Sequence, residues 1–419
     1  MESLPSFLSQ LEILNNYDPE SMPVEQARQL IQHFLLPLAE QETIPLHEAL
    51  HRTLANDMPS PMNVPPHDNS AMDGYAVRFA DLADGADKLK VIASSHAGHH
   101  YAGHVATGEC VRIMTGALIP DGCDSVVMQE HVKADGNMIE ISSSHHRMGQ
   151  NIRRAGEDIG QGATVLAKGQ LIRPVEMGLL ASLGFSEITV YRKLKVAFFS
   201  TGDELQQPGT PLSFGQIYNS NRYTLFGMLR ELDVDILDMG NVRDERDSLK
   251  QSLLDAAGKA DVIITSGGVS VGEADYIKQL LAEIGEVVFW KIAMKPGRPL
   301  AYGKIGTCHF FGLPGNPVAV MVTFQQFVRD ALRILMGQTI KPALTFKAIC
   351  RSAIRKIPGR TEFPRGILAR DDNGELVVYS VGNQGSGILS SMSKANCFIV
   401  LPMPQANVEI GDNVEVQLF

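Results

Sequence analysis

Apolar residues near the start of the chain recur at helical spacing. Over residues 21–40 they fall at steps of three and four, which places them on one face of an amphipathic helix with Ser21 as its expected cap. From residue 43 to about 173 the pattern changes to short alternating segments divided by Pro-Pro, Asp-Gly and glycine-rich turns. This middle portion is predicted to be mostly strand and turn. A second helix is predicted over residues 175–183, directly after Pro174.

Strand and helix signals alternate in the next part of the chain. Short apolar runs at residues 196–199, 262–264, 287–290 and 310–313 predict buried strands. Helical periods at residues 225–232, 277–284 and 324–335 lie between or after them. This alternation predicts a mostly parallel sheet covered by helices, that is, an α/β domain. After Pro342 helical spacing disappears, and short segments ending near residue 418 predict a small β barrel or sandwich.

Composition limits the class of protein. A chain of 419 residues accommodates about two to four domains, and its 44% apolar content excludes global disorder. The formal net charge of −10 disfavours binding to phosphate backbones, so no nucleic-acid partner is expected. No apolar run approaches the length of a membrane span, and no early basic and apolar segment indicates a secretory signal. A soluble, cytoplasmic protein without a membrane partner is expected.

The cysteines agree with that location. None of them is paired at the two-residue spacing typical of zinc or redox motifs, so reduced thiols are expected. The five cysteines are Cys110, Cys123, Cys308, Cys350 and Cys397.

Three polar or glycine-rich loops follow predicted strands of the α/β domain. They are Ser-Thr-Gly-Asp-Glu at 200–204, Thr-Ser-Gly-Gly-Val-Ser at 265–270 and Leu-Pro-Gly-Asn-Pro at 313–317. Ligands of parallel sheets gather at the carboxyl ends of the strands, where helix N-termini favour anions. Glycines there permit close backbone approach, so the three loops together predict a cradle for phosphate or another oxyanion. The alternative is that each glycine only forms a tight turn.

Carboxylates stand beside these loops. Asp203 and Glu204 belong to the first, Asp244 precedes a predicted helix at 245–257, and Asp275 follows the second loop. Carboxylates beside phosphates repel them unless a cation intervenes, and Mg²⁺ prefers one or two carboxylates plus phosphate oxygens. A magnesium site is therefore predicted. The alternative is that Asp244 caps a helix and Asp275 only occupies a first helical turn.

A basic segment follows another predicted strand. Lys291, Lys295 and Arg298 lie within eight residues of one another, and Pro296 and Pro299 restrict the backbone that carries them. Such a segment can present cations to an anion at a low entropic cost. An ordinary solvated basic loop is the alternative.

The middle portion contains further polar clusters. The stretches 67–76, 112–117 and 151–158 are rich in side-chain donors and acceptors, which is typical of loops that bond to themselves. A histidine cluster suits a transition metal, although adventitious binding is the simpler interpretation. The cluster consists of His96, His99, His100 and His104.

Six motifs, taken together, resemble the molybdopterin molybdenumtransferase family. They are Asp-Asn-Ser-Ala-Met-Asp-Gly-Tyr-Ala at 68–76, Ile-Met-Thr-Gly-Ala at 113–117, Ser-Thr-Gly-Asp-Glu-Leu at 200–205, Ser-Gly-Gly-Val-Ser-Val-Gly at 266–272, Lys-Pro-Gly-Arg-Pro at 295–299 and Leu-Pro-Gly-Asn-Pro at 313–317. They occur in the family's order and span nearly the whole chain. The chain is also similar to the C-terminal portion of gephyrin.

The resemblance implies a multidomain, elongated architecture. An elongated domain is expected from residues 1–50 and 147–190, with a β-rich domain of residues 51–146 inserted into it. A molybdopterin-binding α/β domain of residues 191–340 and a C-terminal β barrel of residues 341–419 complete it. The resemblance also implies a homodimer whose cleft combines the α/β domain of one subunit with the inserted domain of the other.

The resemblance implies an enzyme, a transferase of molybdenum cofactor biosynthesis that takes adenylylated molybdopterin and molybdate and releases AMP and molybdenum cofactor with the help of Mg²⁺. The residues implied as catalytic are Asp68, Thr115, Asp158, Glu204, Asp275, Lys291 and Lys295. Those implied to bind the substrates are Ser266, Gly267, Gly268, Arg298, Pro314, Gly315, Asn316, Arg360 and Ser386. The implied metal ligands are Glu204, Asp244 and Asp275.

Two positions depart from the family's pattern. Many members have Lys where this chain has Arg298, which keeps the charge but changes the hydrogen-bond geometry. Many also have Ser where this chain has Ala319, so one hydroxyl contact to an oxyanion is absent here.

Two other functions fit the resemblance. One is a gephyrin-like interaction scaffold, against which stand the retained charged loops. The other is adenylylation of molybdopterin by ATP, since the α/β domain is similar to that of the adenylylating enzyme. For the leading hypothesis, the adenylylating enzyme and acceptor apoenzymes are expected as transient partners.

Overall fold

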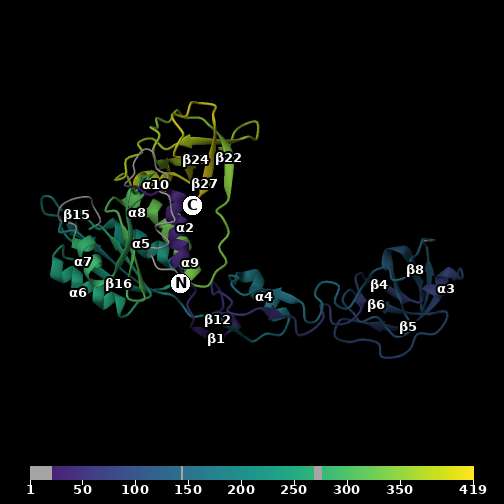
Figure 1. Cartoon of the computed structure of the whole chain (residues 1–419). Helices are drawn as coiled ribbons and strands as arrows, with labels where there is room; N and C mark the ends of the chain where they lie inside the picture. Colours follow the sequence, from purple (N-terminus) through teal and green to yellow (C-terminus); the bar gives the residue numbers. More distant parts are fainter. Residues whose placement is uncertain (1–20, 143–144, 269–275) are drawn as a thin grey trace.

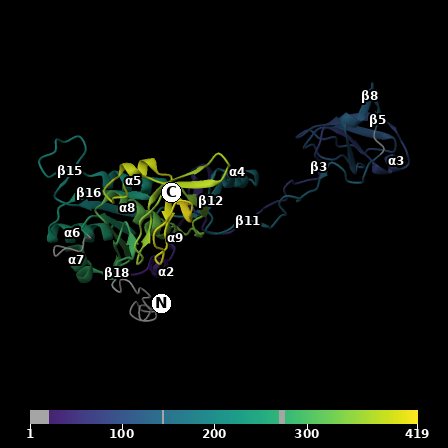
Figure 2. The same cartoon turned by 90° about the horizontal axis from the view of Figure 1, so that it is seen from above.

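The chain forms a compact body joined by a slender arm to a separate β domain (Figure 1). This computed structural model describes residues 21–142, 145–268 and 276–419. The view from above shows the same separation between the body and the distal domain (Figure 2). Over the described residues, no helix combines the length and the apolar character needed to cross a membrane. All five cysteines are free thiols.

The first described helix is shorter than predicted. α2 (Val24–Phe34) begins after Pro23, which is its N-cap and provides no side-chain cap bond, so the expectation that Ser21 caps the helix is wrong. The helix ends at Phe34 rather than near residue 40, and Leu35 is extended. The cause is Pro37, because a proline disfavours helical backbone at the residue before it and cannot continue a helix.

The arm consists of two chain segments that run antiparallel to each other. Three short strand pairs join them, so the chain leaves for the distal domain and returns along the same path. The pairs are β1 (Gln41–Pro45) with β12 (Glu187–Tyr191), β2 (Met58–Pro59) with β11 (Thr164–Leu166), and β3 (Asn69–Ser70) with β10 (Ile152–Arg153). The 3₁₀ helix η1 (Leu46–Glu48) and the predicted helix, α4 (Pro174–Ser182), pack beside the first pair. The domain boundaries given above stay a prediction.

The distal domain is built on a mixed six-stranded sheet in the order β7-β4-β6-β5-β9-β8. Tyr75 and Val77 alternate with Ala76, and the two sets pack into separate small cores on opposite faces. The elements of this domain are β4 (Gly74–Val77), α3 (Phe79–Ala83), β5 (Lys88–Ser95), β6 (Glu109–Ile113), β7 (Ser125–Met128), η2 (Gln129–His131), β8 (Val132–Asp135) and β9 (Met138–Ile141).

The α/β domain contains the predicted sheet, in the order β16-β13-β17-β21-β20-β18. Four strands are parallel, namely β13 (Lys195–Thr201), β16 (Asp235–Val242), β17 (Val262–Ser266) and β21 (Cys308–Leu313). At one edge β20 (Pro299–Ile305) and β18 (Glu286–Lys291) run antiparallel. Apolar runs in the sequence predicted β13, β17, β18 and β21, whereas β16 and β20 were not predicted.

Helices cover both faces of this sheet, as alternation along its buried strands requires. On β13, Val196 and Phe198 belong to the core shared with α2, whereas Ala197 and Phe199 belong to the opposite core. The first core includes α5 (Ser220–Glu231), α8 (Pro317–Thr323), a π-helical turn η3 (Phe324–Val328) and α9 (Arg329–Leu335). The second core includes α6 (Arg246–Ala257) and α7 (Tyr276–Ile284).

The C-terminal portion closes into the predicted barrel, in the order β22-β25-β24-β26-β27. Its elements are β22 (Thr345–Cys350), β24 (Arg365–Arg370), β25 (Leu376–Ser380), α10 (Ser390–Lys394), β26 (Cys397–Val400) and β27 (Asn413–Leu418). Two strands tie the barrel to the α/β domain, since β19 (Met294–Lys295) pairs with β23 (Thr361–Glu362). A further pair, β14 (Leu205–Gln206) with β15 (Ile217–Tyr218), projects beside the sheet.

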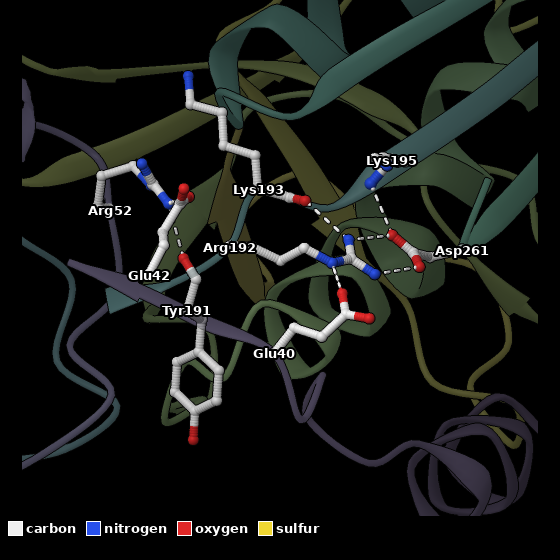
Figure 3. A network of polar contacts seen from close by, with 8 residues as sticks. All are labelled: Glu40, Glu42, Arg52, Tyr191, Arg192, Lys193, Lys195 and Asp261. Carbon is white, nitrogen blue, oxygen red and sulfur yellow. Dashed lines mark hydrogen bonds and ion pairs between the residues drawn. The ribbon is translucent and has the colours of Figure 1, made fainter. Parts of the chain in front are cut away.

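A charged network joins the arm to the α/β domain (Figure 3). Arg192 donates two bonds of 2.7 Å to Asp261 and also pairs with Glu40 of the segment that follows α2. Asp261 accepts a further bond of 2.8 Å from the backbone N–H of Lys195. The side chains of Arg192 and Asp261 are 21% and 18% exposed, so the pair is largely screened from water.

Replacing Arg192 with methionine should lower the free energy of unfolding by about 3 kcal/mol, because Asp261 would be left charged and largely buried. Lys195→Met is the control, since the backbone N–H that bonds Asp261 remains. Chemical denaturation followed by circular dichroism measures both. Equal losses in the two variants would contradict the assignment of this stability to the Arg192–Asp261 pair.

This contribution should depend on pH. Burial by itself would raise the pKa of Asp261, but bonds from Arg192 and from the Lys195 N–H outweigh it and the pKa is lowered. A carboxyl with a lowered folded-state pKa stabilises the fold above its unfolded pKa of about 4, and this stabilisation is lost as the pH falls through the folded value. The difference between wild type and Arg192→Met should thus be full at pH 7 and shrink below about pH 4.

Candidate functional site

A cavity of about 700 Å³ lies at the carboxyl ends of β13, β17 and β21. All three loops singled out in the sequence border it, as their places after parallel strands predicted. Of the predicted site residues, the following line it: Glu204, Asp244, Ser266, Gly267, Gly268, Pro314, Gly315 and Asn316.

The glycines of the second loop are required by the local geometry. Gly267 and Gly268 have φ values of +89° and +68°, in the left-handed region that favours glycine. A Cβ on Gly267 would collide with the carbonyl oxygen of Thr201, and one on Gly268 would come within 2.6 Å of Ile277. The N–H of Gly267 donates a 3.2 Å bond to the carbonyl of Leu313, and the ideal Cβ position of Gly315 lies 3.9 Å from the Cα of Gly267, so the second and third loops are in contact. The glycines therefore do more than form separate turns.

Two helix N-termini open toward this cavity. Asn219 caps α5 by accepting a 3.0 Å bond from the N–H of Arg222. Asn316 is the N-cap residue of α8 and is followed by Pro317. Asn219 and Asn316 both line the cavity. Since free N–H groups and the helix dipole favour anions at these ends, the cavity suits a phosphate.

Asn221 is a cavity residue that the sequence analysis missed. Its Nδ2 donates a 2.7 Å bond to the carbonyl of Gly315, which ties the start of α5 to the third loop. Its buried Oδ1 has no hydrogen-bond partner among the described residues. Asn219 and Asn221 precede the apolar face at 225–232, and Asn is a preferred N-cap residue. These two residues could have indicated a helix N-terminus, and so an anion site, at this point.

The carboxylates gather at one side of the cavity. Burial raises the pKa of Asp244, and the charges of Asp203 and Glu204 raise it further. The 3.5 Å bond that Asp244 accepts from Thr201 acts in the opposite direction. Asp244 does not cap α6, whose N-cap residue is Glu245. Mutual repulsion of this kind is relieved by a cation, which fits the predicted use of Asp244 and Glu204.

The residues present fit a magnesium site whose coordination is completed by oxygens of the bound substrate. In the described part of the chain, no three acidic, histidine or cysteine side chains are placed to hold a metal together. Mg²⁺ commonly takes one or two carboxylates plus substrate phosphates, so Glu204 and Asp244 suffice if phosphate oxygens supply the rest. Asp275, the third predicted ligand, lies outside the described residues.

The predicted cationic residues do not line the first cavity, although Pro299, next to Arg298, does. Lys295 lines a second cavity of about 190 Å³ between the α/β domain and the barrel, and it pairs with Glu362 at 3.2 Å. Arg298 donates to Ser21 Oγ, and the carbonyl of Lys291 accepts from the N–H of Met22. Arg298 and Lys291 thus contact residues 21 and 22, which lead into α2. Arg360, predicted as a substrate ligand, is exposed and lines neither cavity.

Arg365 is a second residue that the sequence analysis missed. It is 1% exposed, and its guanidinium donates 3.0 Å bonds to the carbonyls of Gln384 and Gly385 and to Ser391 Oγ. The predicted residue Ser386 follows Gly385 in the chain. The carbonyl of Ser386 accepts a 3.0 Å bond from the N–H of Val318 at the start of α8.

This loop separates the two cavities. Gly387 borders the first, whereas Gln384 and Arg365 border the second, so Arg365 holds the wall between them. An arginine inside a strand signal of the barrel carries no motif of its own, and only its burial identifies it.

Three predicted residues lie outside the compact body. Asp68 precedes β3, Thr115 follows β6, and Asp158 lies between β10 and β11 of the arm. The distal domain stands well away from α5 and α8, which begin at the cavity, in both views (Figures 1 and 2). Backbone bonding from Ala155, and then pairing with Arg154 at 2.5 Å, lower the pKa of Asp68 despite some burial.

Thr115 is also held by a neighbouring polar loop. It donates to Asp73 from both its N–H and its hydroxyl, at 2.7 and 2.8 Å. These contacts join the polar loops to one another, whereas their composition predicted loops that bond to themselves.

A doubly wound sheet with glycine loops, two helix N-termini and carboxylates at one edge defines a protein that binds a phosphate ester at its strand ends. Three family models match the chain: the MoeA N-terminal region (domain I and II) at residues 22–184, a probable molybdopterin binding domain at 197–334, and the MoeA C-terminal region (domain IV) at 347–419. The chain belongs to the molybdopterin molybdenumtransferase family.

Individual relatives agree with this assignment. The chain is 44% identical to the molybdopterin molybdenumtransferase of Haemophilus influenzae, over 95% of this chain and 98% of that protein. The crystal structure of the molybdopterin biosynthesis MoeA protein from Pyrococcus horikoshii OT3 superimposes with a TM-score of 0.82, at 30% identity and over 95% and 99% of the two chains. Gephyrin of Dictyostelium discoideum is 36% identical over 91% of this chain but only 60% of its own length.

Proposed function

We propose that this enzyme inserts molybdenum from molybdate into adenylylated molybdopterin and releases AMP and molybdenum cofactor, with Mg²⁺ assisting. The observation that supports it most is the cavity in which the three loops meet, in a chain that is 44% identical to a molybdopterin molybdenumtransferase. The scaffold alternative gives no reason for this cavity to retain its carboxylates.

The phosphates of the substrate are seated by backbone groups. The loops around Gly267, Gly268 and Gly315 and the N-terminus of α5 supply N–H donors, and α5 and α8 both supply positive dipole ends. The N–H of Gly267 itself bonds the carbonyl of Leu313, so its neighbours in the loop serve the phosphates. Because these donors are fixed by the fold, much of the rate gain comes from holding the reacting groups in position. Asn221 lines the same cavity, and its Oδ1, which has no hydrogen-bond partner among the described residues, accepts a bond from the substrate and so orients it.

Glu204 and Asp244 would hold the magnesium ion, with Asp275 as the third ligand carried over from the family's pattern. When bound, the ion supplies positive charge to the phosphoanhydride, so that AMP leaves more readily. The raised pKa of Asp244 agrees with this role, since the clustered carboxylates favour a cation among them.

Molybdate is held beside the second cavity. Lys295 and Arg365 line that cavity, and the loop containing Ser386 divides it from the first. Lys291 and Arg298 add positive charge to the segment next to it. Arg360 is exposed and would reach the anion only from outside.

The functional unit is a homodimer. The distal domain and the arm, which carry Asp68, Thr115 and Asp158, extend away from the α/β domain of their own chain, so these residues serve the cavity of a second copy (Figure 1). The exposed apolar side chains of Ile217 and Tyr218 border the cavity and would be covered by that copy, as would the exposed Phe214 a few residues earlier in the chain. The dimer acts in the cytoplasm and contacts the adenylylating enzyme and acceptor apoenzymes transiently.

The test is AMP release from adenylylated molybdopterin and Mg²⁺, with and without molybdate. Release should depend on molybdate, and Glu204→Gln should slow it at least 100-fold because the neutral amide binds Mg²⁺ much more weakly than a carboxylate. Liquid chromatography of AMP and reconstitution of a molybdenum apoenzyme measure the two products.

Glu245→Gln is the matched control. Glu245 is the exposed N-cap residue of α6 next to Asp244 and makes no side-chain cap bond, so near wild-type activity is expected. AMP release that ignores molybdate would contradict the proposal. Unchanged cofactor yield in Glu204→Gln would favour the scaffold, and AMP transfer from ATP to free molybdopterin would favour the adenylyltransferase.

A further inference from the structure

A histidine-lined basin of about 310 Å³ lies on the distal domain, separate from both cavities described above. Three imidazole side chains from two stretches of the chain border it, and all three belong to exposed residues. The full lining is Pro66, His67, Asn69, His96, Gly98, His100, Gly116 and Leu118. Its volume falls near the lower end of small-molecule sites.

Main-chain bonds fix the frame of this basin. His96 and His99 bond to each other through both N–H groups at 3.0 Å, which closes a tight turn that presents His96 and His100. On the opposite side, the N–H of Ser70 donates a 2.9 Å bond to the carbonyl of Ala117. The carbonyl of Ser70 in turn accepts a 2.8 Å bond from the N–H of Gly116. The backbone on both sides of the basin is therefore fixed before any ligand arrives.

The arrangement does not suit the transition metal that the histidine spacing allowed. Within residues 21–142, 145–268 and 276–419, no group of three histidine, cysteine or acidic side chains could share one ion. His104 turns to Asp121, at 2.7 Å, and does not line the basin. The imidazoles instead surround a space large enough for an organic group.

The chemistry of the lining fits a flat nitrogen heterocycle. Imidazole rings stack on heterocyclic bases, and the prolyl and leucyl side chains supply apolar walls. Asn69 lines the basin, and its buried Oδ1 has no hydrogen-bond partner among the described residues. A buried acceptor calls for a donor, and asparagine pairs well with the amino edge of a purine.

We propose that this basin binds a flat, amino-substituted nitrogen heterocycle. Resting on the proposed function, the ligand is the adenine or the pterin end of adenylylated molybdopterin. Its position supports this choice, because His67 directly precedes Asp68 and Gly116 directly follows Thr115. The basin thus continues the polar loops that serve the cavity of the second copy.

Histidine footprinting on the full wild-type chain tests the proposal. Diethylpyrocarbonate modifies exposed imidazoles, and mass spectrometry reports each one. AMP and 6-hydroxymethylpterin are added separately at saturating concentration. Protection of His67, His96 and His100 by at least fivefold is expected with one of the two ligands, and that ligand identifies which end of the substrate is bound. His99 is the matched control, since it shares the turn but does not line the basin.

Variants provide a second measurement. His67→Ala with His96→Ala should weaken binding of the protecting ligand at least tenfold by calorimetry, whereas His67→Phe with His96→Phe should retain it through stacking. Protection by neither ligand, or equal protection of His99, would overturn the proposal. Molybdate-dependent AMP release by the wild type is scored separately, so loss of the basin's role and loss of the proposed function remain distinguishable.

Discussion

Gly267→Ala should lower kcat/KM for molybdenum insertion at least 100-fold. The added Cβ would collide with the carbonyl oxygen of Thr201, and backbone cannot yield as a flexible side chain can. The φ of +89° adds strain for any residue with a side chain. The same loop is hydrogen-bonded to the third loop at Leu313, so its displacement moves phosphate donors of both loops. A shift of about 1 Å can cost 100-fold in rate. Steady-state AMP release at varied substrate measures the loss.

Gly215→Ala separates the collision from the strain. Gly215 has a similar φ of +85°, but its Cβ would meet nothing within 4 Å. It lies in the exposed segment between β14 and β15, so the alanine variant should lose about 1 kcal/mol of stability at most and keep its activity. If both variants lost activity equally, the cavity would not depend on the close approach of Gly267 to Thr201.

The sheet that carries this loop could be predicted from the sequence, because its central strands are buried on both faces and therefore read as continuous apolar runs. Val196 to Phe199 is such a run, and its neighbours pack into two different cores. β20 was missed because its apolar run is short: the strand begins at Pro299, and Gly303 and Lys304 interrupt its second half. The end of α2 was missed because helical spacing continued past Phe34 although Pro37 stops the helix.

The site was predictable only in part, for reasons of distance. Gly267 and Glu204 follow parallel strands, so strand order alone brings them to one edge. Nothing local connects Asp68 or Thr115 to that edge, and only the family resemblance does. Arg365 could not be predicted for another reason. Its role depends on the carbonyls of Gln384 and Gly385, which come close to its guanidinium only when the barrel has formed.

Arg365→Met should have the second large effect, on molybdate use and on stability. The guanidinium satisfies the carbonyls of Gln384 and Gly385 at 3.0 Å in a site that is 1% exposed. Methionine fills much of the space but leaves these carbonyls unpaired, so the free energy of unfolding should fall by about 3 kcal/mol. The loop between the cavities would then relax and Ser386, whose carbonyl accepts a bond from the N–H of Val318, would lose its position. KM for molybdate should therefore rise at least tenfold.

Arg370→Met distinguishes this wall from the barrel at large. Arg370 lies on the same strand, is exposed, and bonds only the carbonyl of Gly374 among the contacts described for its side chain. It should retain the wild-type KM for molybdate, with a stability change within about 0.5 kcal/mol. In Arg365→Met the KM for adenylylated molybdopterin should change less than that for molybdate, because the first cavity is bordered by Gly387 and not by Arg365. A loss of stability with no change in KM for molybdate would show that Arg365 supports only the barrel, and the molybdate site would then have to be sought nearer Lys291 and Arg298.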